Sequence, residues 1–247
     1  MAELRRLLID PARLEGLRSD EQLLHLDQEE RHYLRRVLRK REGDSVALID
    51  GRGHLWHAQL ERGQALRLSD GVENPRDEEP MPSPKLGLAV ALVRRGTDDW
   101  LRMATELGVD VFQPLHADRC TSQAEHRPKR WQTVVREATE QCERLWTPEL
   151  RVACQLEHWD PGPSVRVGFA VSRSDSSQRL DEWLLKSQDS LETWLVVGPE
   201  GGWTATEVDR ALNKGWEPLT MGQTILRTST AAVRGAVSLV SWRSLSF

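Results

Sequence analysis

The segment GPEGGW, residues 198–203, has the composition of a ligand-binding loop. It contains three glycines and directly follows the apolar run WLVV. Glycine adopts positive φ freely and has no Cβ, so backbone N–H groups in such a loop can approach a ligand closely. A plain turn between a strand and a helix needs only one glycine. The loop lacks both the Gly-Lys-Ser/Thr ending of a P-loop and the GxGxxG pattern of a dinucleotide-binding turn.

Two other segments lie where expected strands end. Residues 221–228, MGQTILRT, place Arg227 between a strand end and a helix start, and residues 117–121, ADRCT, follow the expected strand 109–115. Open α/β folds bind their ligands at the carboxyl ends of their strands. These segments are therefore the expected place for a ligand.

The elements that must position these segments alternate between strand and helix, which predicts an α/β fold with a mainly parallel sheet. Residues 86–93 form an unbroken apolar run, typical of a strand buried on both faces. Thr204 and Glu207 form a capping box that opens a helix, and Gly215 closes this helix. The other expected strands are 109–115, 165–171, 193–197 and 216–221, and the other expected helices are 97–107, 128–145 and 228–242.

The N-terminal part has short β-like runs joined by glycine turns, which predict a small barrel or sandwich. A helix over 27–40 is expected to precede them, with Leu34, Val37 and Leu38 on its apolar face. The expected strands are 45–50, 54–60 and 65–68.

Residues 73–84, ENPRDEEPMPSP, are predicted to be a linker, because four prolines and four acidic residues in twelve positions cannot make a core element. The expected organisation is a domain over 1–72, a linker over 73–84 and a second domain over 85–247.

The expected helix 27–40 carries a local basic patch. The chain as a whole has 34 basic and 38 acidic residues and a net charge of −4, which excludes binding of nucleic acid by bulk charge. Six basic residues nevertheless fall within eleven positions, in a half that is neutral overall. Either a solvated helix face or a phosphate-binding surface explains them. The six are Arg31, Arg35, Arg36, Arg39, Lys40 and Arg41.

Cys120, Cys142 and Cys154 show no metal-ligand spacing and their number is odd, so we expect three reduced thiols and no metal. The start of the chain has no apolar signal region, and no run is long enough to span a membrane. A cytosolic protein is expected.

The order of several motifs resembles the ribosomal RNA small-subunit methyltransferase E family of the SPOUT superfamily. GPEGGW and MGQTILRTSTAAV carry most of the likeness. HYLRRVLR (32–39), RMATELGV (102–109), DRC (118–120) and WQTVVREATEQCER (131–144) follow the same order, so the resemblance spans about 7–240.

The resemblance implies a PUA-like β-barrel for RNA, followed by an α/β domain with a deep trefoil knot. It further implies that the knot binds S-adenosylmethionine and that a homodimer methylates N3 of one uridine in 16S ribosomal RNA. By motif, the cofactor-binding residues are Val197, Gly198, Pro199, Gly201, Gly202, Met221, Gly222, Ile225, Leu226, Thr230 and Ala231. The expected RNA-binding residues are Arg31, His32, Arg35, Arg36, Arg39 and Arg119. Valine at Gly201 or Gly222 is expected to block the cofactor through a Cβ clash.

Arg227 and Glu200 are the candidate catalytic residues. N3 of uridine bears a proton between two carbonyls and becomes a nucleophile only when that proton leaves. Arg227 is permanently charged, so it can stabilise the anion or hold a phosphate but cannot act as a base. Glu200 can act as the base or bond the backbone N–H groups of its own turn, and we favour the second role.

The chain departs from the family pattern at three places. Lysine is usual at Met103 and near Asp98, and glutamate is usual at Ser229. Two alternatives therefore stay open: a SPOUT methyltransferase acting on ribose or tRNA, and a catalytically weakened RNA-binding factor in ribosome assembly. The intact glycine loops argue against the second alternative, because a module without a cofactor does not need them.

The expected helix 228–242 is apolar around most of its circumference, with only Arg234, Ser238 and Ser241 as a polar stripe. We expect its own sheet to cover one side and a second subunit the other, although burial within a single subunit would give the same pattern. Among the ten tryptophans, Trp100, Trp131, Trp183 and Trp194 are expected in the core, and Trp203 beside the glycine loop is expected to line a site.

Overall fold

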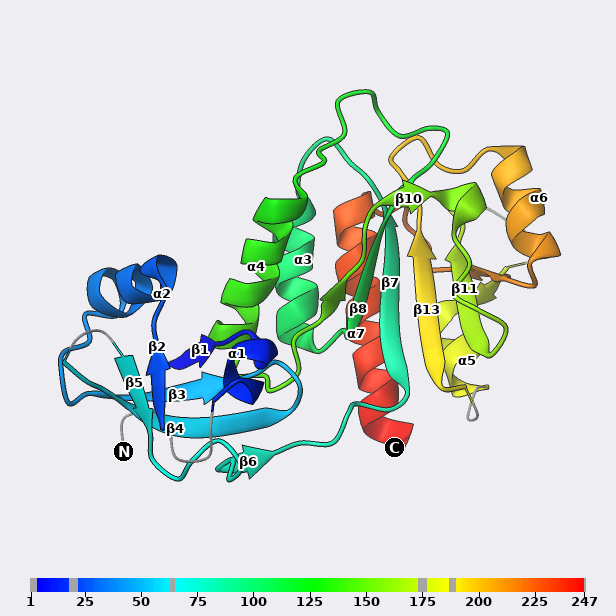
Figure 1. The fold of residues 1–247 in the computed structure, drawn as a ribbon. Helices are drawn as coiled ribbons and strands as arrows, with labels where there is room; N and C mark the ends of the chain where they lie inside the picture. The colour runs from blue at the N-terminus through cyan, green and yellow to red at the C-terminus, as the bar shows by residue number, and fades with distance from the viewer. Residues whose placement is uncertain (1–3, 18–21, 63–64, 173–176, 187–189, 247) are drawn as a thin grey trace. The chain divides into compact units, whose positions relative to one another are not determined.

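The computed structural model describes residues 4–17, 22–62, 65–172, 177–186 and 190–246, and the chain divides into two compact units (Figure 1). The first unit contains Met1–Met81 and Arg136–Thr147, and the second contains Pro82–Val135 and Pro148–Phe247. Each unit has its own hydrophobic core.

The N-terminal unit is built on a sheet with the strand order β1-β3-β4-β5-β2, in which β6 also pairs with β4. The β1–β3 pairing is parallel and the others are antiparallel. One face of the sheet packs Leu7, Leu48 and Leu66 into the core. The predicted strands 45–50, 54–60 and 65–68 are confirmed. The strands are β1 (Arg6–Leu8), β2 (Leu23–His25), β3 (Ser45–Ile49), β4 (His54–Leu60), β5 (Ala65–Leu68) and β6 (Asp77–Glu78), and a short helix α1 (Pro11–Glu15) follows β1.

The predicted helix 27–40 is interrupted. Asp27 and Glu30 form a capping box for α2 (Gln28–His32), which continues as a π-helical turn, η1 (Tyr33–Val37). The N–H of Leu38 donates to the carbonyl of Tyr33 five residues back, at 3.0 Å. This wider turn changes which side chains share a face. Leu34 is buried and Leu38 packs against the core, whereas placing Val37 on the apolar face was wrong, because it is 59% exposed.

The segment predicted as a linker contains β6, whose Glu78 pairs with His54 of β4. Residues 73–81 therefore cluster with the N-terminal unit. The prolines at 75, 80, 82 and 84 flank the two paired residues rather than interrupt them, as the missing N–H of proline requires.

Residues 136–147 belong to the N-terminal unit although they lie far along the chain. Glu140 is buried, and its Oε1 accepts the N–H of Leu8 at 2.8 Å, while Arg136 donates to the carbonyl of Leu8 at 2.9 Å. Burial raises the pKa of Glu140, and the bonds from Leu8 and Arg136 oppose this rise. Leu145 packs with the second face of β3. The segment thus completes this unit's packing.

The C-terminal unit contains an eight-stranded sheet in which every pairing is parallel, as predicted. Its order is β10-β8-β7-β13-β11-β14-β12, with β9 also paired to β8. The strands are β7 (Lys85–Ala91), β8 (Val111–His116), β9 (Glu149–Leu150), β10 (Cys154–Gln155), β11 (Val165–Ala170), β12 (Gln178–Arg179), β13 (Glu192–Val197) and β14 (Glu217–Thr220).

Both faces of this sheet are covered, which explains the apolar run 86–93. Leu86, Leu88 and Val90 point into one cluster with the helices, and Ala89 points into another with Trp194 and Trp216. Figure 1 shows α3 and α7 side by side along the sheet. The helices are α3 (Thr97–Leu107), α4 (Pro128–Gln141), α5 (Leu180–Leu185), α6 (Ala205–Asn213) and α7 (Thr228–Ser246), with a 3₁₀ turn η2 (Leu156–His158).

The four tryptophans predicted in the core are confirmed, since Trp100, Trp131, Trp183 and Trp194 are each at most 2% exposed. α4 ends at Gln141 rather than at 145. The backbone turns at Glu143, where φ is +64°. No sequence pattern predicts α5, which has only six residues.

α7 is covered mainly by its own unit. It packs on β7 and β13 and is flanked by α3 and α5. The predicted polar stripe contacts α5, because Ser238 and Arg234 both donate to the carboxylate of Asp181, at 2.8 and 2.7 Å. Val237 remains 42% exposed. Packing inside one unit therefore accounts for most of this helix's apolar circumference.

Gly87 in β7 provides a test of this core. A Cβ there would overlap the indole of Trp194 on β13, which is fully buried. We expect Gly87→Ala to lower the free energy of unfolding by about 2–3 kcal/mol through overpacking, measured by urea denaturation. The matched control is Gly235→Ala in α7, where the added Cβ first meets the terminal methyl of Leu195. That side chain can rotate and alanine favours a helix, so the control should lose clearly less stability. Equal losses in the two variants would contradict this packing.

Candidate functional site

The loops after β13 and β14 meet around one cavity. Both strands pair in parallel with β11, so their carboxyl ends lie at the same edge of the sheet. The cavity between the loops has a volume of about 350 Å³. It is lined by Ala170, Val171, Ser172, Val197, Gly198, Pro199, Glu200, Gly201, Gly202, Trp203, Val208, Thr220, Met221, Gly222, Thr224, Ile225, Leu226, Thr228 and Ala231. We call it the glycine-loop pocket.

The residues assigned to cofactor binding by motif lie in this pocket, with one exception. Thr230 is exposed on the first turn of α7 and is not part of the lining. Sequence reasoning missed residues 170–172 at the end of β11, because this strand end contains no glycine or other local signal. Trp203 lies in the lining, as expected.

Specific hydrogen bonds join the two loops. The hydroxyl of Thr228, at the start of α7, donates to the carbonyl of Gly198 at 2.7 Å. The indole N–H of Trp203 donates to the carbonyl of Ala170 at 2.8 Å, and its ring stacks on Phe169. A Cβ at Gly198 would lie 2.8 Å from the Trp203 ring. Only glycine therefore allows the tryptophan to close against the strand end.

Gly201 and Gly222 are needed for different reasons. A Cβ on Gly201 would lie 3.0 Å from the Cβ of Arg119, so the protein itself leaves little room for a side chain there. At Gly222 no protein atom lies within 4 Å of an added Cβ, so the expected clash with the cofactor stays a prediction. The φ of Gly222, +137°, is a backbone conformation that side chains disfavour.

Glu207 in α6 ties a third loop to this pair. Its carboxylate is 3% exposed and accepts the N–H of Thr204 at 2.8 Å and the N–H of Asp118 at 2.9 Å. Arg119 donates to the carbonyls of Gly201 and Trp203, at 3.2 and 3.1 Å. The Arg119 side chain, which the motif assigned to RNA, is thus engaged with the glycine loop itself.

Cys120, next to Arg119, is not activated. Its thiol accepts the N–H of Ala117 at 3.3 Å, and burial raises its pKa, so the neutral thiol predominates at neutral pH. The three cysteines are free, as predicted, and they are half-buried rather than fully buried.

The two candidate catalytic residues share a neighbouring cavity of about 490 Å³. We call it the arginine pocket, lined by Val93, Arg94, Arg95, Glu200, Arg227, Thr228 and Ser229. It shares Glu200 and Thr228 with the glycine-loop pocket, so the two cavities adjoin. Glu200 is exposed and, within the described part of the chain, forms no bond to the N–H groups of its turn. The structural role that we favoured for it was therefore wrong.

Arg94 and Arg95 were not identified from the sequence. The available signal was two consecutive arginines just after the strand predicted at 86–93. They lie at a strand end, as the three predicted segments do.

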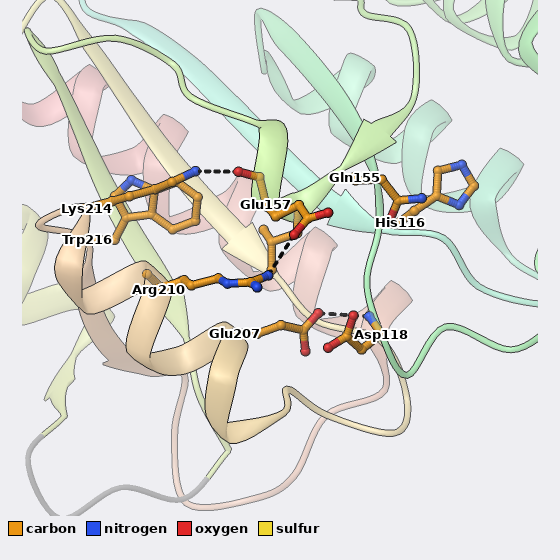
Figure 2. A pocket seen from close by; sticks show the side chains of 10 residues that line it. His116, Asp118, Gln155, Glu157, Glu207, Arg210, Lys214 and Trp216 are labelled. Atoms are coloured by element: carbon orange, nitrogen blue, oxygen red, sulfur yellow. Dashed lines mark hydrogen bonds and ion pairs between the residues drawn. The ribbon is translucent and has the colours of Figure 1, made fainter.

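A third cavity lies between α6 and η2 and is shown in Figure 2. Each acidic and basic side chain in its lining has a partner within the protein. Arg210 pairs with Glu157 at 2.8 Å, and Lys214 donates to the carbonyls of Glu157 and Trp159, at 3.2 and 2.7 Å. These charges hold α6 against η2. We therefore treat this cavity as structural.

The glycine-loop pocket is almost free of charge, because Glu200 is the single ionisable side chain in its lining. No hydrogen bond among the described residues engages the backbone of Ile225 or Leu226. Backbone donors and acceptors between apolar walls can bind the polar edges of a ring system. A phosphate group would lack a cationic partner here. The pocket therefore fits an uncharged or mixed-charge ligand without phosphate.

The basic patch on α2 and η1 is accessible. His32, Arg35, Arg36 and Arg39 are exposed and Arg31 is half-buried, and none of the four arginines pairs with a described carboxylate. Arg39 has a φ of +55° just after the π-helical turn. The patch thus presents unpaired guanidinium groups to solvent.

The described residues contain no group of three histidine, cysteine or carboxylate side chains placed to hold a metal ion. They also contain no helix with the length and apolar character needed to cross a membrane.

Comparison with known proteins gives consistent matches. Residues 79–241 match the model of an RNA methyltransferase domain, and residues 26–68 match that of an RNA methyltransferase PUA domain. The chain is 37% identical over 205 residues to Ribosomal RNA small subunit methyltransferase E of Synechocystis sp., covering 81% of this chain and 67% of that protein.

Two solved structures cover 97% of this chain and 98% of their own, each with a TM-score of 0.78. One is a Legionella pneumophila methyltransferase with bound cofactor SAM, at 27% identity. The other is Ribosomal RNA small subunit methyltransferase E of Neisseria gonorrhoeae bound to S-adenosyl methionine, at 26% identity.

Proposed function

The chain belongs to the ribosomal RNA small subunit methyltransferase E family, and we propose that it transfers a methyl group from S-adenosylmethionine to N3 of a uridine in 16S ribosomal RNA. One observation carries this proposal. A nearly uncharged glycine-loop pocket adjoins an arginine pocket, and the two share Glu200 and Thr228. This arrangement separates a place for the methyl donor from a place for an anionic acceptor.

The glycine-loop pocket fits S-adenosylmethionine. This molecule has a purine, a ribose and a zwitterionic amino acid but no phosphate, which agrees with a lining that has no arginine or lysine. The free backbone groups at Ile225 and Leu226 suit the purine edge, and Val197, Met221 and Ala231 supply apolar walls. When bound, the sulfonium supplies an activated methyl group.

Arg227 and Glu200 face the acceptor from the arginine pocket. We assign Glu200 to accept the N3 proton of uridine and Arg227 to stabilise the charge that develops on the base. Both side chains are exposed in the absence of RNA. Each is therefore free to reorient on a substrate.

The N-terminal unit supplies the remaining RNA contacts in this proposal. Exposed guanidinium groups at Arg35, Arg36 and Arg39 suit backbone phosphates. Arg31 and His32 extend the same surface. The proposed partner, the small ribosomal subunit RNA, would place the enzyme in the cytoplasm.

We include the trefoil knot and the homodimer in the proposal, as family properties. Support for the dimer comes from apolar side chains that α7 and α3 leave in solvent, since Val237 is 42% and Leu107 is 37% exposed. Val240 of α7 lies against Gly108 at the end of α3. The exposed Val237 and Leu107 are therefore on two helices that contact each other. A second copy of α7 would cover these exposed apolar side chains.

Nucleoside mapping tests the reaction. In 16S rRNA from a strain without this gene, we expect mass spectrometry to show the loss of one N3-methyluridine. Wild-type protein should restore it, whereas Arg227→Ala should be slower by roughly 10²-fold in vitro, the usual cost of losing one stabilising donor. Loss of a ribose methyl group or of a tRNA methyl group would instead assign another RNA position. An unchanged methylation pattern would contradict the proposal.

Calorimetry tests the donor pocket. Gly222→Val forces a β-branched residue to φ of +137°, a strain of about 1–3 kcal/mol. We expect S-adenosylmethionine to bind roughly tenfold more weakly or not at all. The matched control is Gly215→Val, which also has positive φ and open space around it but lies outside the pocket. Equal affinities in the two variants would remove Gly222 from the site.

Sedimentation tests the homodimer. At micromolar concentration, we expect a species of twice the 28.2 kDa chain mass. Val237→Glu should shift the sedimenting species toward the monomer, because the charge of the new side chain would be buried on association. A monomer at this concentration in the wild type would refute the dimer.

A further inference from the structure

The arginine pocket contains more positive charge than the proposed catalytic pair requires. Among the described residues, the guanidinium groups of Arg94, Arg95 and Arg227 form neither an ion pair nor a hydrogen bond, and all three residues are exposed. Glu200 is the single carboxylate in the lining. Such a concentration of unpaired guanidinium groups is a ready binding site for an anion.

Most other arginines of this unit are already engaged, which makes this cluster distinctive. Asp98, in the first turn of α3, pairs with Arg130 at 3.0 Å and therefore does not neutralise the cluster. The other ion pairs with arginine include Arg102–Glu106, Arg151–Glu149, Arg166–Glu217, Arg210–Glu157, Arg234–Asp181 and Arg243–Asp110.

The cluster is presented from a fixed base. Val93 is 1% exposed, and its carbonyl accepts the N–H of Glu125 at 2.9 Å, which anchors the chain just before the two arginines. The carbonyl of Arg227 accepts the N–H of Ala231 at 2.8 Å at the start of α7. A long side chain on an anchored backbone loses less freedom when it binds than one on a mobile loop.

Two helices also begin at this pocket. α3 starts at Thr97 and α7 at Thr228, and an added Cβ at Gly96 would lie 3.7 Å from the Cβ of Ser229. The free N–H groups of helix N-termini carry partial positive charge and add to the field of the arginines. The charge of the side chains and that of the backbone therefore favour the same kind of ligand.

We propose that Arg94 and Arg95 bind a backbone phosphate of the substrate RNA beside the nucleotide that is methylated, and so position this nucleotide next to the glycine-loop pocket. This inference rests on the proposed function. The planar guanidinium fork matches the two free oxygens of a phosphodiester. Arg227, which lines the same pocket, is then left to face the base. Arg94 and Arg95 act as positioning residues.

The neighbouring pocket explains why this phosphate belongs to RNA and not to the cofactor. S-adenosylmethionine has no phosphate, and its proposed pocket has no basic side chain. A phosphodiester enters the arginine pocket only with an RNA strand. This phosphate must belong to a nucleotide close to the methylated one, because the base and the phosphate must reach adjoining cavities at the same time.

Filter binding of a 16S rRNA transcript over a series of salt concentrations tests the inference. We expect Arg94→Ala/Arg95→Ala to bind about tenfold more weakly at 0.1 M salt, with a salt slope less steep by about 0.7 to 1.4, because one or two phosphate contacts are lost. The Arg94→Lys/Arg95→Lys variant should recover part of the affinity. Arg102→Ala is the control, because Arg102 is exposed on α3 and pairs with Glu106 outside the pocket.

Kinetics separate positioning from general attraction of RNA. Replacing Arg35, Arg36 and Arg39 by alanine should raise KM and flatten the salt slope while kcat is kept. The Arg94/Arg95 variant should lower kcat as well, because its RNA reaches the donor pocket misplaced. Its affinity for S-adenosylmethionine, measured by calorimetry, should equal that of the wild type.

Each outcome decides a separate question. Unchanged RNA affinity and salt slope in the Arg94/Arg95 variant would overturn the inference and leave the proposed methylation intact. A weaker affinity for S-adenosylmethionine would assign the arginines to folding of the site, which also overturns it. If the variant loses RNA binding while the wild type methylates no uridine, the phosphate site stands and the proposed function falls. A wild type without affinity for RNA would refute both.

Discussion

The carboxylate of Glu207 fixes the geometry on which the site depends. A buried carboxylate is costly unless its oxygens are satisfied. Here the donors are the N–H groups of Thr204 and Asp118, which belong to two different loops. Displacement of either loop would remove a donor from this buried charge. The glycine loop can therefore hold Gly198 against an indole ring and Gly202 at a φ of +67°, because the N–H of Thr204 at its end is bonded to Glu207.

With the loops fixed, the chain separates two electrostatic environments that share a wall. On one side, glycine backbone and apolar side chains exclude phosphate; on the other, three guanidinium groups attract it. Without this separation, the carboxylate of S-adenosylmethionine and the phosphates of RNA would compete for the same arginines. Glu200 lies at the boundary, where a single negative charge can contact either ligand. In the proposed function, this charge distribution directs each ligand to its own pocket.

Much of this arrangement could be predicted from local sequence, because its signals are local. The apolar run 86–93, the capping box at Thr204 and the glycines at 198–202 each act within a few residues, and the corresponding elements are present. Two predictions failed for reasons that the residue pattern does not reveal. The π-helical turn moves Val37 into solvent, and Glu200 makes no bond to its turn. Arg94 and Arg95 belong to the site only because β7 ends beside the start of α7, which sequence spacing does not show.

Residues 136–147 have a consequence for how the protein is made. The N–H and carbonyl of Leu8 are bonded by Glu140 and Arg136, and Gly53 donates to the carbonyl of Leu145. During synthesis, the N-terminal sheet therefore leaves the ribosome long before the segment that completes it. Between these two moments the second face of β3 stays uncovered, and closure must wait for a contact across more than a hundred residues. The N-terminal unit can thus finish folding only after residues 82–135 of the C-terminal unit have also left the ribosome, although this is still before the C-terminal unit is complete.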